Sequence, residues 1–196
     1  GATPLPSCGA VIVATIFTAF IAYVLGLPAI RAGGIYLGII TLAFNEVFVI
    51  LPDLLPDMLG GSEGFPSPDL AFFGVTNLIS ADILYYYVTF AAFVGALYLV
   101  DRALNSEIGW ALLALREDNS VAESVGIDTR RFRLLTFTLA GVFCGLAGGL
   151  FAPLLGYISP SMFGLTTTID IILAGVAGGI SLPAGSILGA FIVVYV

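Results

Sequence analysis

The run CGAVIVATIFTAFIAYVLGLPAI, residues 8–30, has no charged side chain and decides the class of fold. At a rise of about 1.5 Å per residue, a helix of this length crosses the hydrocarbon core of a bilayer, which is about 30 Å thick. The run also lacks the basic beginning of a secretory signal peptide. We therefore interpret it as a genuine membrane span.

Further apolar runs follow at 35–51, 83–100, 132–152 and 166–180, and another starts near Ala184. Of the 196 residues, 59% are hydrophobic and only 10% are charged, whereas ordinary soluble proteins carry about 25% charged residues. The chain is therefore predicted to be an all-α, polytopic transmembrane helical bundle of about five to six spans. Because Pro183 separates the last two runs, they form either two full spans, a tight helical hairpin, a broken helix or a re-entrant element.

The charged residues indicate the orientation of these spans. The cations are all Arg: one lies between the first two runs, and the other five lie between, or at the edges of, the third and fourth (Arg31; Arg102, Arg116, Arg130, Arg131, Arg133). Positive residues favour the cytoplasmic side, so we expect a cytoplasmic loop at 101–131. The segment 52–82 has acidic residues and no cation, and we expect it to be an external loop. The residues 1–196 thus form one transmembrane domain.

Several classes of function are excluded or disfavoured by the composition. The chain has no His, and its two Cys lie in separate apolar runs, so no metal or redox site can be assembled. The net charge of −7 provides no basic surface for nucleic acid. Without any Lys, a Walker A motif for nucleotide hydrolysis is impossible. We expect no catalytic residues, and the scarcity of polar residues in the spans argues against a membrane-embedded enzyme.

Small residues recur at every fourth position in several runs. Such spacing lets helix backbones approach closely, and we interpret these glycines first as helix-packing positions. They form the following series: Gly34 and Gly38; Gly141, Gly145 and Gly149; Gly175 and Gly179; Gly185 and Gly189.

The predicted cytoplasmic loop contains two short helices. Ser106 is placed to cap the first, which runs through Leu115. The second begins at Asn119 or Ser120, where Ser120 and Glu123 have the spacing of a capping box, and Gly126 is placed to end it in a left-handed conformation. A helix of about two turns is unstable alone, so this one should dock against the rest of the subunit or a separate protein.

Four stretches resemble a known family: SEIGWALLALRED with AESVGID at 106–128, RAGGIY with TLAF at 31–44, GGSEG at 60–64 and GYISP at 156–160. They are similar to the branched-chain amino acid ABC transporter permeases, and the resemblance covers nearly the whole chain. The chain has no initiator Met and stops inside an apolar run. We therefore expect a fragment that lacks N-terminal spans and the C-terminal end.

The resemblance implies a transport subunit with no enzymatic activity of its own, in a bacterial-type cytoplasmic (inner) membrane. It implies ABC ATPase subunits that bind the ATP, a second homologous permease subunit and an external solute-binding protein, with no cofactor in this chain. It also implies that the second short helix couples to the ATPase. The residues assigned to that coupling are Arg116, Glu117, Asp118, Ser120, Ala122, Glu123, Ser124 and Gly126.

Four polar residues within the spans are candidates for the solute pathway: Thr41, Asn45, Glu46 and Asp170. Charge at mid-bilayer is costly, so Glu46 either meets a solute ammonium group or locks one helix to another. Asp170 either serves the pathway or is a solvated carboxylate at a helix start. The function implied is import of branched-chain amino acids or related small polar solutes. An ion-coupled secondary transporter or channel, using Glu46, is the alternative.

Overall fold

The computed structural model describes residues 7–32, 34–56, 60–66, 78–117, 119–124, 126–179 and 183–195. The chain divides into two compact units, one made of residues 1–37 and 67–156 and the other of 38–66 and 157–196. Each unit is described by itself below.

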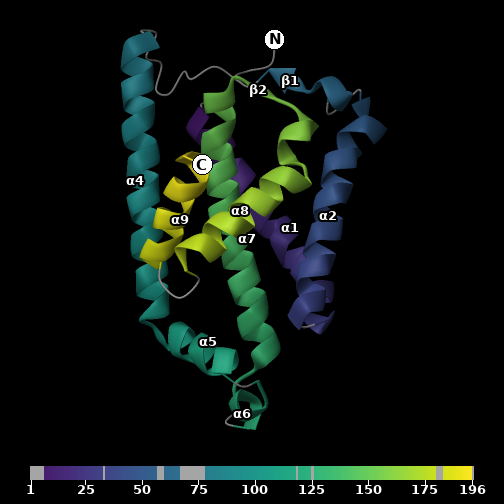
Figure 1. The fold of residues 1–196 in the computed structure, drawn as a ribbon, viewed down its shortest axis with the longest axis vertical. Coiled ribbons are helices and arrows are strands. Elements are labelled where there is room, and N and C mark those ends of the chain that lie inside the picture. The colour runs from purple at the N-terminus through teal and green to yellow at the C-terminus, as the bar shows by residue number, and fades with distance from the viewer. Residues whose placement is uncertain are drawn as a thin grey trace. The chain divides into compact units, whose positions relative to one another are not determined.

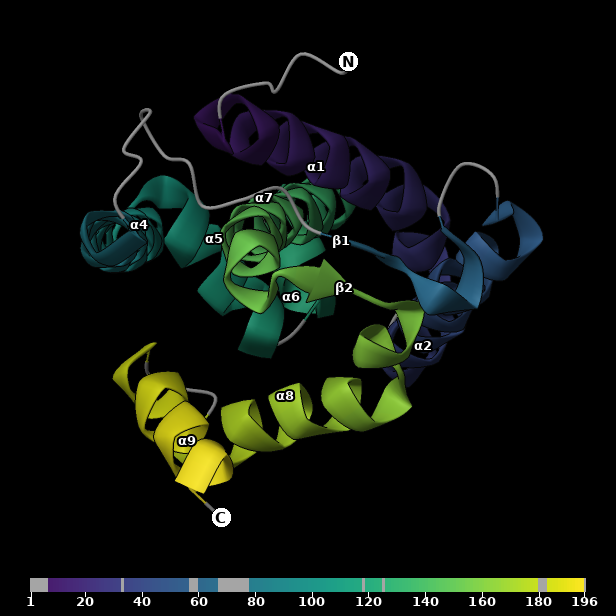
Figure 2. The ribbon, with the colours of Figure 1, turned by 90° about the horizontal axis from the view of Figure 1, so that it is seen from above.

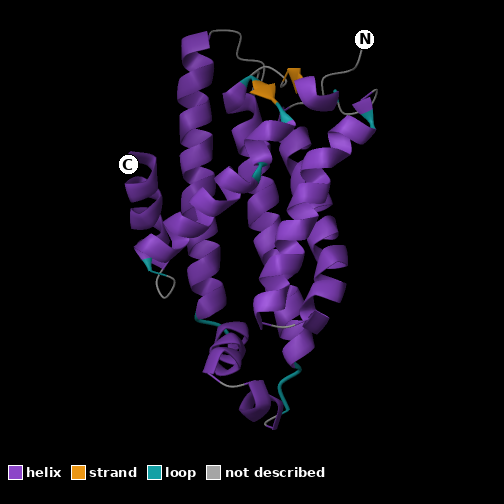
Figure 3. Ribbon diagram, turned by 45° about the vertical axis from the view of Figure 1, so that its right-hand side comes forward, coloured by secondary structure: helices purple, strands orange, loops and turns teal. Residues whose placement is uncertain are grey.

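The described residues contain five segments that are long and apolar enough to cross a membrane. Four are the helices α1 (Ser7–Ala32), α2 (Gly34–Leu54), α4 (Leu78–Leu104) and α7 (Thr129–Leu155), and the fifth runs from Pro160 through α8 (Leu165–Gly178). Figure 3 shows that helix dominates the described chain. The predicted all-α bundle of about five to six spans is therefore confirmed. Helices α4 and α7 have 27 residues each, which is about 40 Å of helix, because both continue beyond their apolar runs into polar sequence.

In the first unit, α1 packs along α7 (Figures 1 and 2). Gly141, Gly145 and Gly149 of α7 form the contact face. A Cβ atom at Gly145 would lie 2.8 Å from Cβ of Thr18 and 2.9 Å from Cα of Thr15, closer than side-chain carbons pack. These three positions therefore have to be small, as their spacing predicted, and they let the backbones of the two spans approach closely.

In the second unit, α8 and α9 (Pro183–Tyr195) pack against each other as a tight helical hairpin. A Cβ at Gly178 would overlap the backbone of Gly185, and one at Gly189 would overlap the carbonyl of Ala174. This packing matches the tight helical hairpin among the predicted alternatives. Three glycines of the predicted series have no atom of the described residues within 4 Å of a Cβ position: Gly38, Gly175 and Gly179.

Two loops far apart in the sequence are joined in the second unit. Strand β1 (Phe65–Pro66) pairs antiparallel with β2 (Tyr157–Ile158), with Phe65 opposite Ile158 (Figure 3). The short 3-10 helices beside them, Gly61–Glu63 and Pro160–Phe163, are also in contact. Gly64 has a φ of +76°, and a Cβ there would overlap the Ile158 carbonyl. Only glycine fits this position, because both the backbone conformation and the space exclude a side chain.

Helices α5 (Glu107–Glu117) and α6 (Asn119–Ser124) lie between α4 and α7, as the sequence predicted. Figure 1 shows them at one end of these two spans, and α5 contacts α4, α6 and α7. Ser106 stands directly before α5, but its hydroxyl donates to the carbonyl of Ala103 at 2.6 Å. That bond ties the start of α5 to the end of α4.

Candidate functional site

The end of α6 is closed by a Schellman turn. Gly126 has a φ of +88°. Its N–H donates to the Glu123 carbonyl at 3.0 Å, and the N–H of Ile127 donates to the Ala122 carbonyl at 3.1 Å. These two bonds satisfy carbonyls that a helix end leaves unpaired. The predicted left-handed role of Gly126 is confirmed.

The start of α6 differs from the capping box expected for Ser120 and Glu123. The helix begins at Asn119, which places Ser120 inside its first turn. The carboxylate of Glu123 binds forward along the chain, where its Oε1 accepts a hydrogen bond of 2.8 Å from Oγ1 of Thr129. Thr129 is the first residue of α7 and is only 8% exposed. Glu123 therefore fastens α6 to the next span.

The start of α7 is capped by Asp128, which the sequence analysis did not single out. Its side chain accepts a hydrogen bond from the backbone N–H of Arg131 at 3.2 Å. The same carboxylate forms an exposed ion pair with the Arg131 side chain at 2.8 Å, which adds little stability in water. Asp is a favoured residue at helix starts, and this one, four residues before the apolar run at 132–152, was visible in the sequence.

Helix α6 is docked, as its length required. Ala122 is only 2% exposed, and α6 contacts both α5 and α7. On the outer side, Glu123, Ser124 and Gly126 are exposed. Of the remaining predicted coupling residues, Asp118 lies outside the described residues, and so do the side chains of Arg116, Glu117 and Ser120. The described part of the site is therefore a short, fixed helix with one buried and one exposed face.

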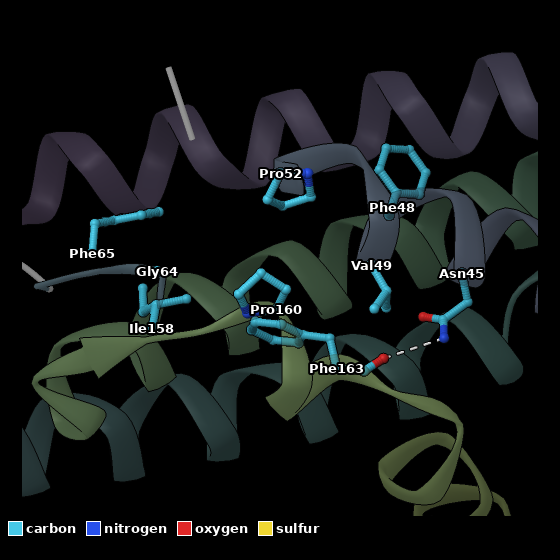
Figure 4. Close-up of a pocket in the computed structure, with 9 residues that line it drawn as sticks. All are labelled: Asn45, Phe48, Val49, Pro52, Gly64, Phe65, Ile158, Pro160 and Phe163. Carbon is cyan, nitrogen blue, oxygen red and sulfur yellow. Dashed lines mark hydrogen bonds between the residues drawn. The ribbon is translucent and has the colours of Figure 1, made fainter. Parts of the chain in front are cut away.

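A pocket of about 370 Å³ lies in the second unit, between α2 and the paired loops (Figure 4). Among the described residues that line it, Asn45 has the only polar side chain. Its amide nitrogen Nδ2 donates to the Phe163 carbonyl at 3.2 Å, the dashed line in Figure 4. The lining residues are Asn45, Phe48, Val49, Pro52, Gly64, Phe65, Ile158, Pro160 and Phe163. Such a pocket can take an aliphatic side chain and offer one amide group for a hydrogen bond.

The other three predicted pathway residues are not among the residues given above for this pocket. Thr41 lies one turn before Asn45, and its hydroxyl donates to the Gly38 carbonyl at 2.8 Å. Glu46 is half-buried, and because successive helix residues point about 100° apart, it lies on a different side of α2 from Asn45. Asp170 is exposed and lies beyond the first turn of α8, which has no acidic residue. The reading of Asp170 as a helix-start carboxylate is therefore wrong.

Comparison with known proteins identifies the family. The family model described as "Branched-chain amino acid transport system / permease component" matches residues 4–196. The chain belongs to this family. This permease component is 31% identical over 204 residues to the high-affinity branched-chain amino acid transport system permease protein LivM of Escherichia coli K12, a match that covers 93% of the chain and 48% of the relative.

Two further relatives carry other solutes in their names. The permease component is 30% identical over 174 residues to the autoinducer 2 import system permease protein LsrC of Klebsiella pneumoniae, covering 86% of the chain and 45% of the relative. It is 30% identical over 137 residues to the galactofuranose transporter permease protein YtfT of Escherichia coli K12, a match that covers 66% of the chain and 38% of the relative. The chain thus spans less than half the length of these relatives. No solved structure matches it.

Family membership and the five membrane-compatible helices make this chain part of a multi-pass membrane protein. The family match covers both of the loops at 60–64 and 156–160. Their pairing through β1 and β2 brings Gly64, Ile158, Pro160 and Phe163 to the pocket. No local signal in either loop identifies its partner, because strand pairing depends on contacts between distant residues.

Proposed function

We propose that this chain is the membrane-spanning part of an ABC importer permease subunit, which takes up branched-chain amino acids or related small polar solutes. Separate ATPase subunits drive it, docked at α6. The observation that carries the proposal is the construction of α6: a helix of six residues, closed by Gly126 and tied to Thr129, between two long apolar helices.

A short helix transmits force only when it is stiff and attached. The Schellman turn and the buried Ala122 fix α6 against α5 and α7, while Glu123 and Ser124 remain exposed for a partner. The chain has no Lys and so no Walker A motif. The importer proposed here receives its energy from separate ATPase subunits, and α6 is the described element best built to receive it.

The solute assignment rests on the pocket under the paired loops and on the relatives. Apolar walls and a single amide suit an aliphatic side chain better than a sugar, which needs many hydrogen bonds. The LivM relative is named for branched-chain amino acid transport. We accordingly place the subunit in a bacterial-type inner membrane, with a second permease subunit and an external solute-binding protein as partners.

The test is to express the full-length subunit with the ATPases encoded beside it and to compare Gly126→Val with the parent. A β-branched residue with φ near +88° costs at least about 1–2 kcal/mol, so the variant should lower ATPase co-purification or ATP-dependent uptake. Gly148→Ala, a position where a Cβ meets no atom within 4 Å, is the control. Unchanged association and unchanged uptake in Gly126→Val would remove α6 as the docking site. Uptake driven by an ion gradient without ATP would instead support a secondary transporter.

A further inference from the structure

We propose that the hydrogen bond from Thr129 to Glu123 is a latch that carries displacement of α6 into α7, which makes Thr129 a positioning residue for transport. The coupling part of this inference rests on the function proposed above. The latch itself rests on geometry alone. Throughout, "the latch" means the bond between Oγ1 of Thr129 and Oε1 of Glu123, 2.8 Å long.

Besides the packing of α6 on α5 and α7, the described connection from α6 to α7 runs through the backbone around Gly126. That residue is in a left-handed conformation, and no atom of the described residues lies within 4 Å of the place where its Cβ would be. A glycine in open space is where a chain bends most easily, because it lacks side-chain contacts and its conformational range is wide. The latch bridges Gly126 from Glu123 on one side to Thr129 on the other. It therefore closes a small loop and prevents bending at its centre.

The chemistry of the latch requires a hydroxyl at position 129. An ionised carboxylate only accepts hydrogen bonds, so the donor has to come from Thr129. Glu123 is exposed and can exchange the bond for water, but Thr129 is 8% exposed and cannot be well hydrated. A buried hydroxyl without its partner is costly, so the bond favours the closed loop. Valine has nearly the same shape as threonine and no donor.

Helix α7, which receives the displacement, is packed against a second span, α1. It packs on α1 through Gly141, Gly145 and Gly149, where an added Cβ would meet an atom of α1 at 3.3 Å or less. Two helices packed this closely shift together more readily than they separate. A push on α6 held by the latch thus moves the pair α1 and α7. A push on α6 without the latch is absorbed by bending at Gly126.

The latch is tested first by hydrogen exchange on the full-length transporter in lipid nanodiscs, without nucleotide. Thr129→Val should speed exchange of the α6 amides, residues 119–124, by about tenfold, since a net hydrogen bond to a charged group is worth about that factor. Thr138→Val is the matched control, because the hydroxyl of Thr138 is also partly buried but donates within α7, to the Leu134 carbonyl at 2.8 Å. Thr129→Ser keeps the donor and should exchange like the parent.

Two exchange results would overturn the latch. One is an α6 exchange rate in Thr129→Val equal to that of Thr138→Val, and the other is the same acceleration in Thr129→Ser as in Thr129→Val. If Thr129→Val does not yield folded protein, Thr129→Ala removes the same donor without adding bulk and is read by the same criteria.

The coupling role is tested by the number of solute molecules imported per ATP hydrolysed in proteoliposomes. Thr129→Val should lower this ratio by up to about tenfold, the factor that corresponds to the same hydrogen-bond energy. ATPase co-purification should stay at the parent level, and Thr129→Ser should restore the ratio. An unchanged ratio in Thr129→Val would refute the coupling role. If the proposed function is wrong, solute uptake will not need an ATPase. The hydrogen-exchange experiment tests the latch whether or not the proposed function holds.

Discussion

Moving one methyl group across the interface between α1 and α7 provides the sharpest test of their packing. A Cβ at Gly141 would overlap the side chain of Ala22, while its next neighbours, the Thr18 carbonyl oxygen and Cα of Ala19, lie at 3.4 and 3.6 Å. Only the Ala22 methyl group thus stands in the way. Gly141→Ala should destabilise the subunit, and adding Ala22→Gly should rescue it.

The size of each effect follows from the packing. Overpacking costs about 1–3 kcal/mol, from which Gly141→Ala recovers about 1 kcal/mol of helix propensity. Ala22→Gly alone loses about 1 kcal/mol of propensity and about 0.8 kcal/mol of buried methyl. In the double variant the propensity terms cancel and the overlap is gone. Its free energy of unfolding should therefore return to within about 1 kcal/mol of the parent, a favourable coupling of about 2 kcal/mol.

The assay measures the free energy of unfolding of the full-length permease subunit in detergent by thermal or denaturant titration. It compares the parent, the two single variants and the double variant. Gly148→Ala is the control on the same helix, because its Cβ meets no atom within 4 Å, and it should leave stability unchanged or slightly raised. Simple addition of the two single effects would show that Gly141 and Ala22 do not face each other, and the packing described for α1 and α7 would then be wrong.

Three further predictions concern the second unit. Gly64→Ala should lower solute uptake several-fold, because the added Cβ pushes β1 away from β2 at Ile158. Gly38→Ala is the control and should leave uptake unchanged, because its Cβ would have no atom of the described residues within 4 Å. Equal uptake in the two variants would contradict the role of this strand pair. Asn45→Leu should raise the KM for uptake and leave subunit assembly intact, and an unaltered KM would exclude the pocket as a solute site. Glu46→Gln should change uptake more than assembly, so normal uptake kinetics would refute a pathway role for Glu46.

The coupling segment was predictable to a large extent from local sequence. The left-handed Gly126 and the presence of two short helices depend on neighbouring residues only, and both are confirmed. The capping-box spacing points back from Glu123 to Ser120, whose side chain lies outside the described residues, whereas the described bond of the Glu123 carboxylate runs forward to Thr129. A local sequence pattern indicates which residues a side chain can bind. The conformation of the turn after α6 decides that the Glu123 carboxylate lies next to Thr129.

By itself, the sequence determined that this is a polytopic helical membrane protein, because long uncharged runs have no other stable form in a bilayer. It also determined which glycines were able to sit between helices. Only the tertiary structure decided which of them do: Gly145 packs against Thr15 and Thr18, while Gly38 has no neighbour. The pocket around Asn45 likewise exists only because β1 pairs with β2 across the sequence. Spacing along a chain fixes the face of a helix on which a residue lies, but what lies opposite that face is fixed by the packing of distant segments.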